Sequence, residues 1–275
     1  MPELPEVESI RRSLAGRLAG CRIQEVEILL PRQIKWPDPH GFSARLMGHR
    51  IAGLKRKGKY LLFVLDNGDY LVIHLRMTGR LLYAPDGLVQ DAYARILFHL
   101  EGGAVLIYAD TRTLGAVYAM KADELWRIKG LAEMGPEPLT DEFDAVYLQE
   151  TLKGKKVKIK SFLLNQKFIG GIGNIYADEA LFLAGIHPLR SAGSLSAGEA
   201  EVLRQAVNKV IGDGIAEGGT TFRDYIDGDG KKGHHQENLF VYHRQGMPCR
   251  NCGTCIEKIV VGGRGTHFCP RCQKI

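Results

Sequence analysis

The sequence predicts an α+β protein built from three successive parts. The first half of the chain contains paired apolar runs separated by turn residues, which is the pattern of β-hairpins. The middle of the chain has apolar residues at helical spacing, and its last part is rich in cysteine and glycine. We therefore expect a β-rich first domain with flanking helices, a helical second domain and a small metal-binding unit.

Composition is that of a globular protein. The chain has 275 residues, of which 45% are hydrophobic and 25% are charged, enough for one large domain or two ordinary ones. No apolar run approaches the roughly 18 residues that a membrane-spanning helix needs. The N-terminal residues also lack the basic start and apolar centre of a signal peptide. We therefore expect a cytoplasmic protein that contacts no membrane.

Positive charge is concentrated in two segments. The formal net charge is only +6. Residues 240–275 contain six basic residues and one acidic residue, and so contribute +5. A second cluster places five lysines between positions 153 and 160. Clustered positive charge suits a polyanion, although a solvated lysine face explains the second cluster, taken alone, equally well.

The first expected element is a helix over residues 5–18, whose apolar residues recur on one face. Two hairpins follow it. Runs 60–65 and 70–75 flank an Asn-Gly turn, and runs 95–100 and 104–108 flank Glu-Gly-Gly. Asn-Gly is a strong hairpin signal because both residues tolerate positive φ. The first part of the chain is therefore expected to be mainly antiparallel sheet.

A proline pair at Gly135-Pro136-Glu137-Pro138 interrupts the chain near its middle, because two prolines cannot continue a helix or a central strand. Beyond it the pattern is helical. The helices are expected over residues 141–151, 160–166, 174–184 and 196–217. We place the domains at 1–134 (β-rich), 135–150 (linker and start of the helical domain), 151–239 (helical) and 240–275 (metal-binding).

Four cysteines form the pattern C-x2-C-x16-C-x2-C, namely Cys249, Cys252, Cys269 and Cys272. This is the spacing of a four-cysteine zinc ribbon. A disulfide framework is the alternative, and a reducing cytoplasm disfavours it. Cys255 also forms a C-x2-C pair with Cys252, and we expect it to be a bystander. The sequence thus predicts one structural Zn²⁺ per chain, which supplies much of the folding energy of this unit.

Two glycine-rich turns have the composition of phosphate-binding loops. Residues 262–266 resemble a β-hairpin tip where Arg264 could pair with a phosphate, an exposed structural arginine being the alternative. The turn at 168–173 precedes Asn174, the expected N-cap of the next helix, whose free N–H groups would attract phosphate. Tyr176 occupies the third glycine position of G-x-G-x-x-G, and no strand precedes the turn, so a dinucleotide-binding fold is disfavoured.

Three motifs occur together along the chain: Pro-Glu-Leu-Pro-Glu-Val-Glu at 2–8, Gly-Gly-Ile-Gly-Asn-Ile-Tyr at 170–176, and the closing C-x2-C pairs. With them the whole chain, from residue 2 to residue 274, resembles the bacterial formamidopyrimidine-DNA glycosylases, also called 8-oxoguanine DNA glycosylases. The resemblance implies an N-terminal β-sandwich, a helix–two-turns–helix module and a zinc finger. It also implies double-stranded DNA with oxidised bases as the partner. We expect a monomer associated with the bacterial nucleoid.

The implied activity is excision of oxidised purines (8-oxoguanine, formamidopyrimidines) in base-excision repair, followed by strand cleavage through β,δ-elimination. Pro2 would be the nucleophile once Met1 is removed. An α-amine has a pKa of about 8, against about 10.4 for lysine, so far more of it is unprotonated at neutral pH. Attack on C1′ of the sugar gives an iminium (Schiff base) that acidifies the C2′ proton. Glu3 is the expected general acid/base.

Other site residues are assigned from the resemblance by position. Lys59 is similar to the family's catalytic-site lysine, which contacts the phosphate beside the lesion. Arg264 is similar to its zinc-finger arginine, assigned to DNA binding and to δ-elimination. Lys160 and Asn174 match residues that clamp the DNA backbone around the flipped nucleotide.

Three further positions match the residues that fill the gap left by the extruded base: Met77, Arg112 and Leu114. Methionine is flexible enough to enter a base stack, and arginine can pair with the orphaned cytosine. Core packing is the alternative for Met77. Leu114 departs from the family's usual Phe and loses aromatic stacking. The family's frequent His is missing from residues 91–94, which puts a phosphate contact in doubt, and Cys255 replaces what is commonly Pro.

A polar loop at 220–235 is expected to cover the extruded base. Its glycines favour a mobile lid, and backbone N–H groups near Arg223, Asp224 and Tyr225, together with Thr221, would read the O6 edge of the purine. A disordered surface loop is the alternative.

Two other functions are consistent with parts of the pattern. An endonuclease VIII-like glycosylase for oxidised pyrimidines is disfavoured by Leu4, where those relatives usually have Gly, and by the long loop. A non-catalytic zinc-ribbon DNA-binding protein would not need Pro2 and Glu3, and both are present.

Overall fold

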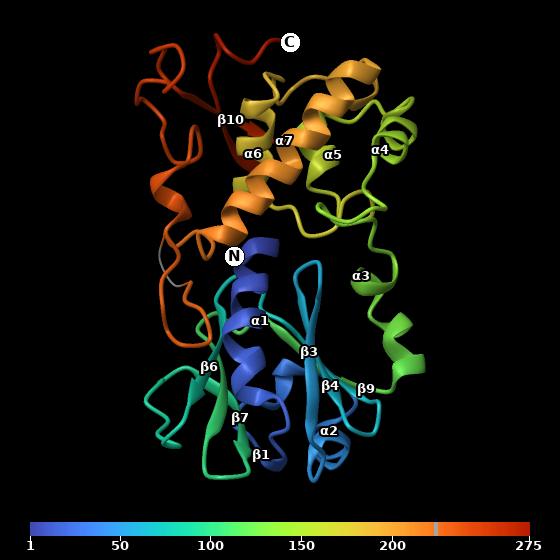
Figure 1. Ribbon diagram of the computed structural model, residues 1–275, viewed down its shortest axis with the longest axis vertical. Helices are drawn as coiled ribbons and strands as arrows, with labels where there is room; N and C mark the ends of the chain where they lie inside the picture. The colour runs from blue at the N-terminus through green and yellow to red at the C-terminus, as the bar shows by residue number, and fades with distance from the viewer. Residues whose placement is uncertain (223–224) are drawn as a thin grey trace. The chain divides into compact units, whose positions relative to one another are not determined.

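The computed structural model describes residues 1–222 and 225–275 and divides into two compact units (Figure 1). The first unit comprises Met1–Ala132 and Glu217–His234, and the second comprises Glu133–Ala216 and His235–Ile275. The sequence placed the loop 220–235 with the helical domain. Nearly all of that loop instead belongs to the first unit, because its hydrogen bonds and packing, described below, are made to the first helix.

Two sheets build the first unit. The four-stranded sheet has the order β1-β7-β8-β6 and consists of β1 (Ile23–Ile28), β6 (Gly79–Ala84), β7 (Ala94–Leu100) and β8 (Val105–Asp110). The five-stranded sheet has the order β2-β9-β5-β4-β3 and consists of β2 (Ile34–Trp36), β3 (Ile51–Lys57), β4 (Tyr60–Leu65), β5 (Tyr70–His74) and β9 (Ala116–Met120). Both predicted hairpins are confirmed, since β4 pairs with β5 and β7 pairs with β8.

Helix α1 (Leu4–Leu18) follows the predicted periodicity and buries Val7, Ile10, Leu14 and Leu18. These side chains share one core with apolar residues of both sheets, so the sheets and the helix form a single sandwich (Figure 1). Burial of each large aliphatic side chain in such a core stabilises the fold by about 1.5–3 kcal/mol. The described residues of this unit also form four shorter helices: η1 (Pro31–Gln33), α2 (Pro39–Leu46), η2 (Ala122–Arg127) and α3 (Lys129–Ala132).

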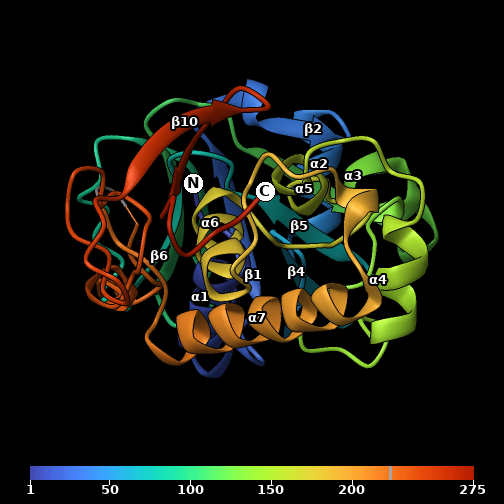
Figure 2. The same cartoon turned by 90° about the horizontal axis from the view of Figure 1, so that it is seen from above.

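Helices dominate the second unit, in which α7 packs against α4 and α6 (Figure 2). The helices are α4 (Ala145–Leu152), α5 (Ile159–Leu163), α6 (Asn174–Leu183), η3 (Ala192–Ser194), α7 (Ala197–Ala216) and η4 (His235–Glu237). Helix α4 starts later than residue 141 because the Asp144 side chain caps it, accepting from Tyr147 N at 2.7 Å. Gly185 ends α6 with φ +67°, as its sequence position predicts.

Asn174 was expected to be the N-cap of α6, and this was wrong. Gly173 is the N-cap, and Asn174 is the first helical residue. The Asn174 side chain is directed elsewhere: its Nδ2 donates to the carbonyl oxygen of Gly265 at 3.0 Å. The C-terminal part of the chain therefore determines the role of this residue.

Strands β10 (Glu257–Val261) and β11 (Arg264–Phe268) form the predicted hairpin near the C-terminus. Gly262 and Gly263 make its two-residue turn with φ +56° and +73°. Positive φ at both turn positions is the geometry that suits the twist of a hairpin, and glycine adopts it without strain. Among the residues described, we find no helix with the length and apolar character needed to cross a membrane.

Candidate functional site

The N-terminal residues of the first unit are folded into the protein. Pro2 is buried and Glu3 is only 3% exposed, whereas Met1 is 49% exposed. Glu3 is the N-cap of α1 and forms a capping box with Glu6, whose Oε2 accepts from Glu3 N at 2.8 Å. The backbone that joins Pro2 to α1 is therefore fixed.

Lys59 lies in the tight turn between β3 and β4, where Gly58 has φ +56°, and its side chain is 6% exposed. Burial, together with the charges of Arg76 and Lys59, lowers the pKa of His74 to about 3. His74 is thus neutral at physiological pH. Its Nδ1 accepts from Arg76 N at 3.1 Å, so Nε2 carries the proton. This group of cationic side chains and one neutral donor has the chemistry to hold an anion.

Two turns at the ends of the strands carry the three predicted gap-filling residues. Met77 is 43% exposed and Leu114 is 53% exposed, and Arg112 is also exposed. Met77 is therefore not a core residue. Two exposed apolar side chains and an exposed guanidinium have the shapes needed to enter a base stack and to pair with a base.

Asp110, which is fully buried, holds these two turns together. Its Oδ1 accepts from Thr78 Oγ1 at 2.6 Å and from Arg112 N at 3.2 Å, and its Oδ2 accepts from Gly115 N at 2.8 Å. Charge-assisted hydrogen bonds of this kind are the stronger ones in proteins. Sequence reasoning missed Asp110, although it begins the segment that contains Arg112 and Leu114.

The loop predicted to cover the base contains four predicted recognition residues. Arg223 and Asp224 lie outside the described residues. Thr221 Oγ1 donates to Tyr225 O at 3.1 Å, and Tyr225 is partly buried against the sandwich core. Burial raises the pKa of Tyr225. These two side chains thus shape the loop itself.

Lys160 has a different environment from the one expected of a residue that clamps DNA. Its side chain is fully buried, and its Nζ lies 2.6 Å from Asp178 Oδ1 in α6. The ammonium also donates to Thr266 Oγ1 at 2.7 Å and to Gly265 O at 3.1 Å. Lys160 therefore supports the hairpin β10–β11 from within.

The tip of that hairpin presents Arg264, which is exposed and pairs with Val261 across the turn. Gly265, the next residue, is held by both Lys160 and Asn174 through its carbonyl oxygen. Further along the strand, the N–H of His267 donates to Asp178 Oδ2 at 2.8 Å. The second unit thus offers an arginine at the end of a hairpin whose second strand is held by buried polar groups.

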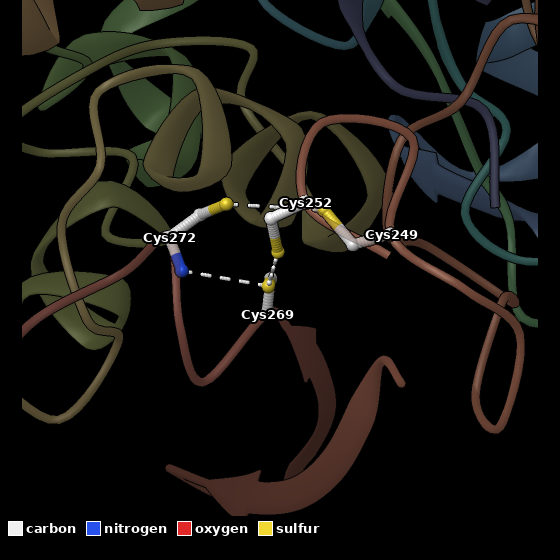
Figure 3. Close-up of side chains that lie close together, drawn as sticks. All are labelled: Cys249, Cys252, Cys269 and Cys272. Atoms are coloured by element: carbon white, nitrogen blue, oxygen red, sulfur yellow. Dashed lines mark hydrogen bonds between the residues drawn. The ribbon is translucent and has the colours of Figure 1, made fainter. Parts of the chain in front are cut away.

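The four predicted zinc ligands come together (Figure 3). Their Sγ atoms all lie within 4.8 Å of one another, including Cys252–Cys269 at 3.5 Å and Cys249–Cys272 at 3.9 Å. Tetrahedral Zn²⁺ with Zn–S bonds of about 2.3 Å needs sulfur atoms roughly 3.8 Å apart. The four thiols therefore form a structural zinc site. Cys255 is exposed and lies outside this cluster.

Glu179 attaches the segment that enters the zinc site to α6. Its carboxylate accepts from the backbone N–H groups of Phe240, Val241 and Tyr242 at 2.8–2.9 Å. Burial raises the pKa of Glu179. Phe182 of the same helix also packs into the small core of the zinc unit. The unit depends on α6 as well as on its metal, a dependence that spacing alone did not reveal.

The fold and these sites define a protein with an N-terminal β-sandwich, a helical module and a four-cysteine zinc finger. Three family models match these parts in order. Residues 1–117 match the formamidopyrimidine-DNA glycosylase N-terminal domain, residues 134–225 match its H2TH domain, and residues 246–275 match the zinc finger found in FPG and IleRS.

Full-length relatives agree with the family models. The formamidopyrimidine-DNA glycosylase of Desulforamulus reducens is 46% identical over 275 residues, covering 100% of this chain and 99% of the relative. That of Heliobacterium modesticaldum is 48% identical over 278 residues, covering all of both chains. The chain belongs to the formamidopyrimidine-DNA glycosylase family and is a DNA glycosylase.

Solved structures have the same fold. A Lactococcus lactis FPG mutant in complex with Fapy-dG containing DNA superposes with a TM-score of 0.93 at 36% identity, covering 100% of both chains. The MutM (FPG) protein of Thermus thermophilus gives a TM-score of 0.91 at 39% identity, covering 99% of this chain and 98% of that one. The fold class and the family predicted from the sequence are confirmed.

Proposed function

We propose that this protein excises oxidised purines from double-stranded DNA and then cleaves the strand by β,δ-elimination, with the amine of Pro2 as nucleophile. The observation that carries the proposal is the burial of Pro2 and Glu3 at the start of α1, where Glu3 and Glu6 form a capping box. A chain terminus is usually frayed and solvated unless something ties it down. A held terminal amine beside a buried carboxyl group is what nucleophilic catalysis requires.

The reaction begins once Met1 is removed. The Pro2 amine attacks C1′ of the damaged nucleotide, and the base departs with a proton. The C1′–O4′ bond then breaks and O4′ takes up a proton, so the sugar ring opens to an iminium. The iminium acidifies C2′, and loss of that proton expels the 3′ phosphate (β-elimination). A second elimination expels the 5′ phosphate. Glu3 is the group nearest along the chain that can give and take these protons.

Two other sets of residues support DNA binding. Lys59 and the neutral donor His74 have the chemistry to contact a phosphate, and Arg264 extends a second cation from the hairpin tip. Met77, Arg112 and Leu114 are exposed on turns held by Asp110, as insertion into a duplex requires. The relatives from L. lactis were solved with DNA containing Fapy-dG or an abasic site, which supports the same partner here.

Oxidised purines are favoured over oxidised pyrimidines because the chain has a long loop, residues 217–234, and described residues of this loop bind α1. The test uses three duplexes that contain 8-oxoguanine, thymine glycol or a preformed abasic site. The proposal expects excision of 8-oxoguanine in preference to thymine glycol, and cleavage of the abasic strand. Preference for thymine glycol would favour the pyrimidine enzyme, and binding without excision or cleavage would leave only a DNA-binding protein.

A further inference from the structure

Glu6 joins the proposed catalytic N-terminus to the base of the loop 217–234. Resting on the proposed function, we infer that Glu6 is a positioning residue that keeps this loop in register with Glu3 during base excision.

The two ends of the loop, residues 217–221 and 233–234, are hydrogen-bonded to each other, and we call them the neck. His234 N donates to Glu217 O at 3.0 Å, and Gly233 N donates to Thr221 Oγ1 at 3.0 Å. The two legs pack so closely that a Cβ on Gly233 would lie 2.1 Å from Gly219 O. The neck therefore behaves as one body, and whatever holds Gly219 also holds the returning leg.

Each oxygen of the Glu6 carboxylate binds a different segment. Oε2 accepts from Glu3 N at 2.8 Å, and Oε1 accepts from Thr220 N at 2.7 Å. The side chain of Glu6 is 1% exposed, so both bonds are shielded from water. Because one rigid, planar group makes both bonds, displacement of Thr220 is transmitted to the backbone of Glu3.

Packing of the neck on Glu6 is equally close. Gly219 has φ +85°, and a Cβ there would lie 2.9 Å from both Cγ and Oε1 of Glu6. The hydroxyl of Tyr225 lies 3.2 Å from the carbonyl oxygen of Glu6 and 3.0 Å from that of Gly218. The outgoing leg of the neck thus contacts the side chain of Glu6, and Tyr225 contacts its backbone.

A second attachment lies further along α1. Gly228 N donates to Ser13 Oγ at 2.9 Å, and Arg17 pairs with Asp229 at 2.7 Å. Glu6 differs from Ser13 and Arg17 because its side chain binds both the loop and Glu3. Ser13→Ala therefore loosens the loop without touching the capping box.

The test variant is Glu6→Gln. Glutamine is a normal capping-box residue, so its amide oxygen still accepts from Glu3 N. Its NH2 group then faces Thr220 N, and a donor is placed against a donor. The substitution releases the neck and leaves the start of α1 capped. Glu124→Gln is the matched control, because Glu124 occupies the same capping-box position at η2, accepting from Lys121 N at 3.1 Å.

Two rates are measured for each protein under single turnover: excision of 8-oxoguanine and cleavage of a preformed abasic site. Glu6→Gln is expected to lower excision by at least about tenfold, the scale of losing a hydrogen bond to a charged group. Abasic-site cleavage should change by less than about threefold. Tyr225→Phe should act in the same direction, and the double variant should lose less than the product of the two single effects.

Hydrogen exchange supplies a readout independent of activity. The amide of Thr220 should exchange faster in Glu6→Gln than in wild type, and at the wild-type rate in Glu124→Gln. If the wild type neither excises 8-oxoguanine nor cleaves abasic DNA, the proposed function itself fails. If the wild type does both, an unchanged ratio of the two rates in Glu6→Gln overturns the role of Glu6. Unchanged exchange at Thr220 would also overturn it.

Discussion

Neutral, buried His74 makes the stability of the first unit depend on pH. Its pKa is lowered from 6.5 to about 3 in the folded protein, mainly by burial and then by Arg76 and Lys59. Between these two pH values the unfolded chain binds the proton and the folded chain does not, so stability rises with pH in this window. The destabilisation is absent above pH 6.5 and grows as pH falls toward 3.

The size of the effect follows from the shift. One pKa unit corresponds to about 1.4 kcal/mol, so lowering the pH from 7 to 5 should remove about 2 kcal/mol of stability through His74 alone. His74→Asn should abolish this dependence, because Asn does not titrate and its Oδ1 can accept from Arg76 N. The variant also loses the edge-on contact between the His74 and Tyr60 rings, whose centroids lie 4.5 Å apart. This loss lowers the free energy of unfolding by about 0.5–1.5 kcal/mol and does not vary with pH.

Urea unfolding followed by tryptophan fluorescence measures this effect in the first unit. The chain has two tryptophans, Trp36 and Trp126, and both belong to that unit. The free-energy difference between wild type and His74→Asn should change by about 2 kcal/mol between pH 7 and pH 5, in favour of the variant at low pH. Parallel pH profiles for the two proteins would refute the assignment of a neutral, buried His74.

Three further predictions concern metal, the buried ion pair and the exposed turns. Cys252→Ser should lower the zinc content and weaken DNA binding while Cys255→Ser leaves zinc unchanged; metal analysis showing loss in the latter would mean a different ligand set. Lys160→Met should destabilise the protein by about 3–5 kcal/mol by calorimetry, because the buried Asp178 carboxylate loses its cationic partner. Adding Asp178→Leu should recover part of that loss, and equal or greater loss in the double variant would contradict this. Asp110→Asn should weaken binding to lesion-containing duplex roughly tenfold in a titration, because the carboxylate binds both turns. Unchanged affinity would show that DNA binding does not need these hydrogen bonds.

Local patterns in the sequence determined much of the fold. The Asn-Gly turn between 60–65 and 70–75 and the helical spacing of α1 each encode structure within a short segment, and both predictions are confirmed. The zinc ligands were predictable for the same reason, since each C-x2-C pair is a local turn and the two pairs need only one hairpin to meet.

Non-local contacts explain what the sequence did not reveal. The loop 217–234 belongs to the first unit partly through the bond from Thr220 N to Glu6, residues 214 positions apart. Lys160 looks like one more surface lysine in a basic run, and only its pairing with Asp178 on another helix makes it a buried structural group. Side-chain patterns do not specify such partners, because any acidic residue of the chain could satisfy the lysine.

Identification of the nucleophile tests the central proposal most directly. The protein is incubated with duplex DNA that contains an abasic site, reduced with borohydride and digested, and the adduct is located by mass spectrometry. The reduced adduct is expected on the amine of Pro2, in chains that have lost Met1, and Pro2→Gly should greatly reduce its yield. An adduct on an internal lysine such as Lys59, with Pro2 unmodified, would contradict it.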